Sequence, residues 1–166
     1  MHLVTSSLFL PSLLPHLSVD SKNKFLRSYF AVILGYWISQ GRAKLDIENF
    51  YASTVSNPIA PSLHPRANPE TLVKDHPTPN PWYPILQSTL VHPGEHLLKL
   101  ERALAHYASL YGTTPVNRFK DTELEHGGKL DGTLFLRTAW LSLNTNGWMR
   151  EGDEKGGWDF SGFFDE

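Results

Sequence analysis

The most extended apolar stretch of this chain, between Ser18 and Gly41, predicts one long helix. Ser18 or Asp20 is suited to cap its N-terminus, and Gly41 is suited to stop it after Ser39. Its apolar residues are spread over more than one face of the helical wheel: Phe25, Leu26, Tyr29, Phe30, Ile33, Leu34, Trp37 and Ile38. Because a helix that is apolar nearly all round is usually buried on several sides, we expect this one to lie inside the fold.

A second long helix is predicted from His92, with Pro93 at its favoured first position, to a stop at Gly112. Its apolar residues keep to a single stripe formed by Leu97, Leu100, Leu104, Tyr107 and Tyr111. This spacing is typical of a helix that packs one face against a core.

Shorter helices are predicted over residues 6–14, after a cap at Asp46, over 82–91 and over 133–144. No strand pattern is present, so the predicted class is mostly α, as an irregular single helical domain over residues 1–166. Residues 57–84 hold eight of the twelve prolines and form a long Pro-rich connection. The tail from Trp148 combines glycines with aromatic residues, which indicates a strap packed across a surface. We expect Trp37, Trp140, Trp148 and Trp158 to be core residues, and a wall for a flat aromatic substrate is the alternative.

The composition of the chain excludes several classes of function. The chain has 166 residues, of which 40% are hydrophobic and only 19% charged, so we expect a partner chain or a missing neighbouring segment to cover part of its surface. The net charge of −2 and the lack of a basic stripe argue against nucleic acid. There is no cysteine, which excludes disulfides and thiolate metal sites. No segment reads as a membrane span or a signal peptide, so we expect a cytoplasmic protein without a membrane partner.

The only cluster with evident chemical potential lies on the predicted helix from His92. His96, Lys99 and His106 follow one margin of the apolar stripe, and the small Ala103 between them leaves room for a ligand or for a closely packed helix. His96 and Lys99 could share a site, whereas the two histidines lie about 15 Å apart along the axis. The alternative is that these are ordinary margin residues that reach water. No dinucleotide fingerprint, P-loop, GxSxG or HExxH motif is present, and Glu123, Glu125 and Asp131 read as solvated loop carboxylates.

Several strings of residues, taken together in their order, resemble the fungal questin oxidase-like family. They are His92–Leu104, Leu130–Arg137, Gly147–Gly152 and Gly157–Phe160, with Phe9–Leu17, Leu26–Phe30 and Gly41–Ile47 upstream. The resemblance implies an oxidoreductase of polyketide metabolism that opens the ring of anthraquinone-type substrates with dioxygen, in a Baeyer–Villiger-like step often linked to NADPH.

The resemblance also implies a non-haem iron held by several histidines and a carboxylated lysine. The lysine of the His-Leu-Leu-Lys motif is Lys99, with His96 and then His16 as weaker candidates. Carboxylation would turn a metal-repelling ammonium into a carbamate whose oxygens suit iron, and it requires a partly buried, neutral amine.

Members of the family are much longer than this chain, so we expect it to be the C-terminal half of a larger fold, incomplete alone. A helical interaction module or pseudoenzyme, docking onto a partner or a second copy, is the alternative.

Overall fold

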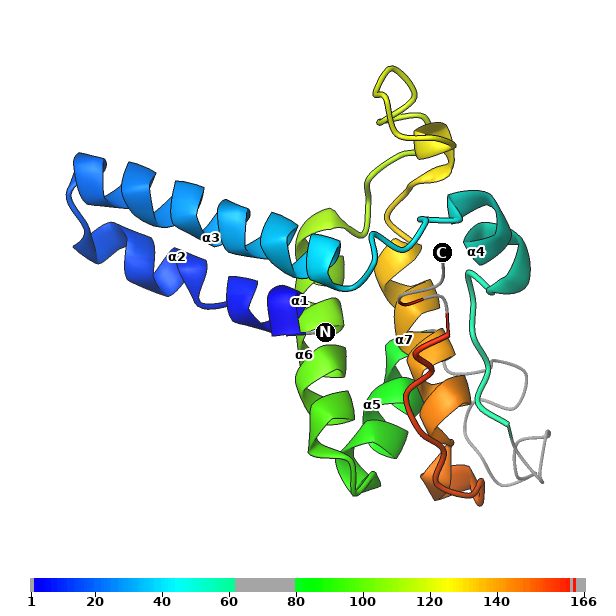
Figure 1. Cartoon of the computed structure of the whole chain (residues 1–166). Helices are drawn as coiled ribbons and strands as arrows, with labels where there is room; N and C mark the ends of the chain where they lie inside the picture. The colour runs from blue at the N-terminus through cyan, green and yellow to red at the C-terminus, as the bar shows by residue number, and fades with distance from the viewer. Residues whose placement is uncertain (1, 62–79, 162, 164–166) are drawn as a thin grey trace. The chain divides into compact units, whose positions relative to one another are not determined.

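A computed structural model describes residues 2–61, 80–161 and 163 of the chain (Figure 1). These residues are mostly helical and include no strand, which confirms the predicted class. They fall into two compact units: residues 1–45 with 159–166, and residues 46–158. No helix among the described residues is both long and apolar enough to cross a membrane. Most of the predicted Pro-rich connection, residues 62–79, lies outside the described residues.

The first unit is a helical hairpin. Its elements are α1 (His2–Ser7), α2 (Leu10–Leu13), the 3-10 turn η1 (Leu14–His16) and α3 (Val19–Ser39). Ser18 caps α3, because its side chain accepts a hydrogen bond from the Ser21 N–H. The Tyr29 hydroxyl donates to the Leu3 carbonyl at 2.9 Å and lies 2.8 Å from Ser6 Oγ, which joins α3 to α1.

The expectation that α3 is buried on several sides is wrong, since no side chain of α3 is buried. Tyr29 and its neighbours on the same side are half-buried, whereas Phe30 and Trp37 are among many exposed apolar residues of the helix. The physical reason is that the slender hairpin partner of α3 can cover only one side of it.

The second unit holds the core. Its elements are α4 (Ile47–Ser53), α5 (Trp82–Val91), α6 (Glu95–Tyr111), the turn η2 (Gly127–Lys129), α7 (Leu134–Asn146) and the turn η3 (Met149–Glu151). The helices α5, α6 and α7 pack on one another, as Figure 1 shows. Fully or nearly fully buried apolar side chains from these helices and from Trp148 form the core: Ile85, Leu97, Leu100, Ala103, Leu104, Ala139, Leu143 and Trp148.

The helix predicted over residues 82–91 is confirmed as α5. The Pro-rich connection, expected to reach Pro84, therefore ends earlier, and Pro84 sits in the first turn of α5, where a missing N–H costs no helical hydrogen bond. One predicted boundary is wrong. The helix expected from His92 begins at Glu95. His92 instead ends α5, and its ring accepts the Gly94 N–H at Nδ1 (2.9 Å), which closes the turn between the two helices.

Of the four tryptophans expected in the core, Trp148 is 1% exposed, while Trp37 and Trp158 are exposed. In the tail, the Gly156 N–H donates to the Asn146 carbonyl at 2.8 Å, so this part of the chain lies against the C-terminal end of α7. At Gly147, with φ of +98°, a side chain would meet the Glu154 carbonyl oxygen, which explains the glycine at this close approach.

Candidate functional site

The predicted candidate residues His96 and Lys99 lie in the first turns of α6, and hydrogen bonds of His92 hold the junction before that helix. His92 is buried, and its Nε2 lies 3.0 Å from the Asn146 carbonyl at the end of α7. With Nδ1 accepting from Gly94, the ring is the neutral tautomer that donates from Nε2. Gly94 then caps α6, and Glu95 follows in the first turn, where the helix dipole favours a negative charge.

Glu95 is the centre of a small polar cluster on this turn. Its Oε1 lies 3.2 Å from Lys99 Nζ and 3.7 Å from His96 Nδ1. The hydrogen bond and the charge of Lys99, followed by the charge of His96, hold the pKa of the Glu95 carboxyl below its ordinary value. The structure therefore brings His96 and Lys99 together, as predicted, and adds a carboxylate that the sequence analysis did not single out.

Lys99 does not lie beside the buried stripe. On the helical wheel it faces the side opposite to Leu97, and its side chain is 49% exposed. The ion pair with Glu95 is one that Lys99 makes as an ammonium. Ala103, which was expected to leave space in this region, is fully buried, and its burial supports close packing rather than an open pocket.

The other two histidines considered lie elsewhere. His106 is exposed two turns further along α6, where its ring packs edge-on against Tyr107. His16 is exposed at the end of η1, in the first unit. Within the described parts of the chain, no three His, Cys, Asp or Glu side chains are placed to hold a metal ion. The ligand roles of Lys99, His96 and His16 stay predictions.

The cluster of Glu95, His96 and Lys99 fits an iron ion only in part. The cluster offers one imidazole and one carboxylate, which are suitable ligands, but the third group repels a cation for as long as it is an ammonium. Lys99 becomes a donor only if it is carboxylated, and further ligands must then come from outside α6.

The residue that the sequence analysis missed is Glu101. Its side chain is fully buried, and neither carboxylate oxygen has a hydrogen-bond partner among the described residues. Burial raises the pKa of Glu101 well above its ordinary value. Ser88 on the neighbouring helix α5 is also fully buried, with its hydroxyl likewise unpartnered in the described structure. The sequence contained a signal, because Glu101 lies four residues after Leu97 and three before Leu104, about 40° from Leu97 at the margin of the apolar stripe.

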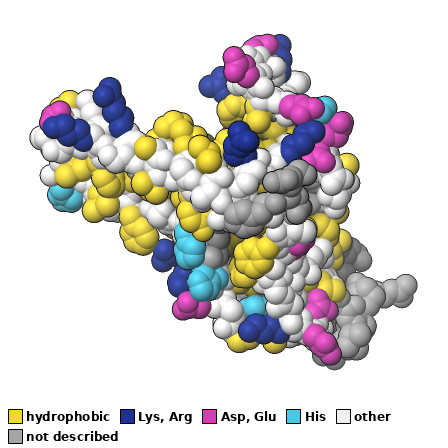
Figure 2. Space-filling view, viewed as in Figure 1, with side chains coloured by type: hydrophobic (Ala, Val, Ile, Leu, Met, Phe, Trp, Pro, Cys, Tyr) yellow, Lys and Arg dark blue, Asp and Glu magenta, His cyan; other side chains and the backbone are white. Residues whose placement is uncertain are grey.

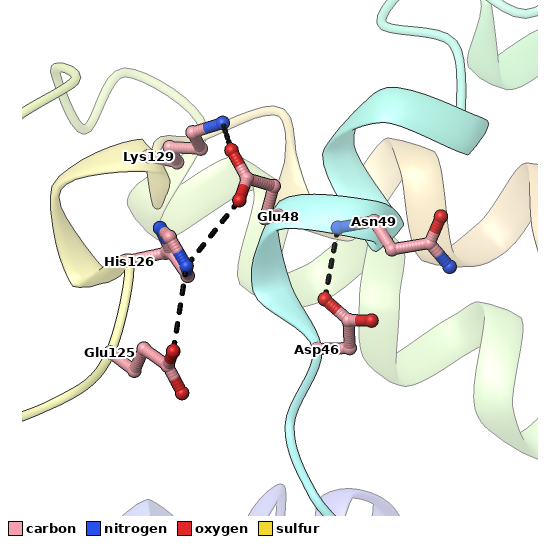
Figure 3. Close-up of polar contacts among 6 residues, drawn as sticks. All are labelled: Asp46, Glu48, Asn49, Glu125, His126 and Lys129. Atoms are coloured by element: carbon pink, nitrogen blue, oxygen red, sulfur yellow. Dashed lines mark hydrogen bonds and ion pairs between the residues drawn. The ribbon is translucent and has the colours of Figure 1, made fainter.

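A second polar cluster joins α4 to the loop before α7 (Figure 3). Lys129 Nζ lies 2.5 Å from Glu48 Oε1, and His126 Nε2 lies 3.4 Å from Glu48 Oε2 and 3.7 Å from Glu125 Oε1. Asp131, expected to be a solvated carboxylate, is instead structural, because its Oδ1 accepts from the backbone N–H and the hydroxyl of Thr133 at the start of α7. The cluster around Glu48 connects segments of the second unit and includes none of the predicted metal ligands.

Comparison with models of protein families shows to which family the chain is related. The family model described as questin oxidase-like matches residues 1–104, which is more than half of the chain. This chain belongs to the questin oxidase-like family. The match includes the His92–Leu104 string with Lys99, and it ends before the similar strings at 130–137, 147–152 and 157–160. The assignment places the chain in a family of oxidoreductase type. No curated protein and no solved structure matches the chain significantly.

Proposed function

We propose that this questin oxidase-like chain takes part in the dioxygen-dependent ring cleavage of anthraquinone-type polyketides. In such a reaction one oxygen atom is inserted next to a ring carbonyl, and the other leaves as water with two electrons from a reductant such as NADPH. The single observation that carries the proposal is the family match over residues 1–104, which includes the first turns of α6.

The proposal gives Lys99 the role of a carboxylated ligand to a non-haem iron, with His96 beside it and His16 as a further candidate. The neutral amine would attack carbon dioxide, so that a nitrogen–carbon bond forms and one proton leaves. The iron, when bound, would supply dioxygen chemistry. Lys99, His96 and Glu95 would hold it from one turn of α6, with the remaining ligands supplied by other parts of the molecule or by a partner.

The first turn of α6 supports this role in one respect and opposes it in another. His96 and Glu95 place donors that suit iron next to Lys99. The same Glu95 carboxylate stabilises the ammonium form of Lys99, and this form does not react with carbon dioxide. Carboxylation therefore requires that a bound cation take over Glu95.

The test is to add ferrous iron and ¹³C-labelled bicarbonate to the full chain under anaerobic conditions. A carbamate carbon signal that needs both additions, with about one iron per chain, is expected. Lys99→Ala should abolish the carbamate signal, whereas Lys120→Ala, at an exposed loop position, should not.

Iron binding without a carbamate signal would remove Lys99 from the ligand set. Neither iron nor carbamate, in the presence of a candidate anthraquinone and NADPH, would favour the alternative of a non-catalytic helical module. That alternative is favoured by the exposed apolar surface of α3.

A further inference from the structure

Five of the eight exposed large apolar side chains of α3 lie along one stripe, and the other three, Val32, Tyr36 and Ile38, lie outside it. Val19, Leu26, Phe30, Leu34 and Trp37 are between 40% and 74% exposed. On a wheel of about 100° per residue they fall within an arc of about 80°. We call these five residues the α3 stripe. The opposite side of the helix carries mainly small and polar residues: Ser21, Lys24, Ser28, Ala31, Gly35 and Ser39.

Basic residues lie along both margins of the α3 stripe. Arg27 falls about 20° beyond one edge of the arc, and Lys22 about 40° beyond the other. Lys24, further round, is paired with Asp20 at 2.7 Å. Long basic side chains at the margins of an apolar surface can lay their hydrocarbon stems along it and extend their charges outward.

The helical hairpin itself carries an excess of basic residues. Residues 1–45 contain five Lys or Arg residues and one acidic residue, Asp20, a net charge of +4. The first unit also includes residues 159–166, which add three acidic residues, so the whole unit has a net charge of +1 and residues 46–158 have a net charge of −3. Figure 2 shows hydrophobic side chains over the visible face of the first unit, with Lys and Arg side chains among them.

We propose that the α3 stripe and its basic margins dock onto an anionic lipid surface, with α3 lying in the interface. An apolar stripe with large aromatic residues can enter the boundary between headgroups and acyl chains, and basic margins then meet the negative headgroups. The earlier expectation of no membrane partner rested on the lack of a spanning segment and does not bear on this mode of contact.

The charges favour lipid over a second copy of the chain on the same surface. Two hairpins that met through their α3 stripes would bring the Lys22 and Arg27 side chains of both copies together, and these like charges would repel each other. An anionic bilayer offers both hydrocarbon for the stripe and negative charge for both margins.

Co-sedimentation of the full chain with lipid vesicles tests the proposal. We expect binding to vesicles of phosphatidylcholine with phosphatidylserine, and weak binding to phosphatidylcholine alone. Raising the salt concentration should weaken the binding, because it screens the attraction. Arg27→Gln should reduce the partition coefficient about fivefold, in line with the typical contribution of one basic residue near an anionic surface.

Matched variants on α3 separate the stripe from general apolar exposure. Phe30→Ser should reduce binding about tenfold or more, since it removes a large side chain from the interface. Val32→Ser, at a residue as exposed as Phe30 but on the far side of the helix, should leave binding unchanged. Lys24→Gln is the control for Arg27→Gln: it also removes a basic charge, but at a position away from the α3 stripe, and should leave binding nearly unchanged.

Three results would overturn the proposal. The first is no binding to either kind of vesicle, and the second is equal binding to neutral and anionic vesicles. The third is concentration-dependent dimerisation in analytical ultracentrifugation that Phe30→Ser abolishes while vesicle binding is unaffected, which would assign the stripe to a second copy.

Discussion

The two longest helices, α3 and α6, use their apolar residues in opposite ways. The 17-residue α6 buries Leu97, Leu100, Glu101, Ala103 and Leu104 on one side, while the 21-residue α3 buries no side chain although its sequence is the more apolar. The difference shows that burial follows the periodicity of apolar residues and the neighbours available, rather than their number. In α6 the stripe meets α5 and α7, whereas α3 has a slender hairpin on one side.

Within α6, two neighbouring ionisable residues also differ in burial. Lys99 and Glu101 lie about 160° apart on the wheel, on nearly opposite sides of the helix. Lys99 is half-exposed and paired with Glu95, while Glu101 is buried without a partner among the described residues. The ionisable group in a dry environment is therefore the carboxyl, not the amine on which the sequence prediction of a metal ligand rested.

The largest expected effect is on the free energy of unfolding, and it is tested by comparing one leucine from each helix. Leu97→Ala should lower the free energy of unfolding by about 2–5 kcal/mol, since it opens a cavity in the core of α5, α6 and α7. Leu34→Ala, at a residue 41% exposed on α3, should cost less than about 1 kcal/mol. Urea unfolding followed by tryptophan fluorescence and by circular dichroism measures both. Equal losses would mean that α3 is as tightly packed as α6.

The second prediction concerns the buried carboxyl. Glu101→Leu should raise the free energy of unfolding at pH 8 by about 1–3 kcal/mol, because it removes a buried polar group that lacks a partner. The raised pKa of Glu101 means that the folded protein holds this proton more tightly than the unfolded chain, whose carboxyl has a pKa near 4.5. The contribution of Glu101 to the stability of the wild type should therefore be fullest below pH 4.5 and be lost as the pH rises through the folded-state pKa.

In the Glu101→Leu variant this part of the pH dependence should disappear. Urea titrations at several pH values give the comparison, and Glu95→Gln on the exposed side of α6 is the control, because its carboxyl contributes in the opposite sense. Destabilisation by Glu101→Leu at pH 8 would show that the carboxyl has a partner in solution.

The third prediction concerns the junction before α6. His92→Phe keeps a ring of similar size but removes the hydrogen bonds to Gly94 N and the Asn146 carbonyl. A loss of about 1–2 kcal/mol is expected in thermal or urea unfolding, since both backbone groups lose their partner. His106→Phe, at an exposed position of the same helix, should change the stability by less than about 0.5 kcal/mol. If the two variants behave alike, His92 does not hold the turn.

Much of the fold was predictable from sequence because local signals are strong there. Asp46 was predicted as a cap, as was one of Ser18 and Asp20, and the side chains of Asp46 and Ser18 accept the expected backbone N–H. The start of α6 was misplaced, because Pro93 suits a first helical turn and nothing local reveals that the His92 ring reaches Asn146, 54 residues away. That contact is tertiary and cannot be read from a window of neighbouring residues.

The candidate site was predictable only in part for a similar reason. The spacing of His96 and Lys99 placed them on one turn, and the structure does bring both to Glu95. The burial of Glu101 and the exposure of Lys99 depend on which side of α6 meets α5 and α7. A wheel of α6 places Glu101 at the margin of the stripe, where a charged residue is ordinarily expected to reach water.

The smallest expected effect concerns the exposed side of α6. Because Lys99 is the main cause of the lowered pKa of Glu95, Lys99→Met should raise that pKa toward its ordinary value, with the remaining lowering due to His96. An NMR titration of the Glu95 side-chain carboxyl carbon measures this directly, and Lys120→Met should leave the curve unchanged. A folded-state pKa below that of the unfolded chain stabilises the protein above the unfolded value, and this contribution is lost as the pH falls through the folded-state pKa. If Glu95 instead titrates above its ordinary value in the wild type, the group at Lys99 is not an ammonium, and a negatively charged carbamate would account for the reversed direction.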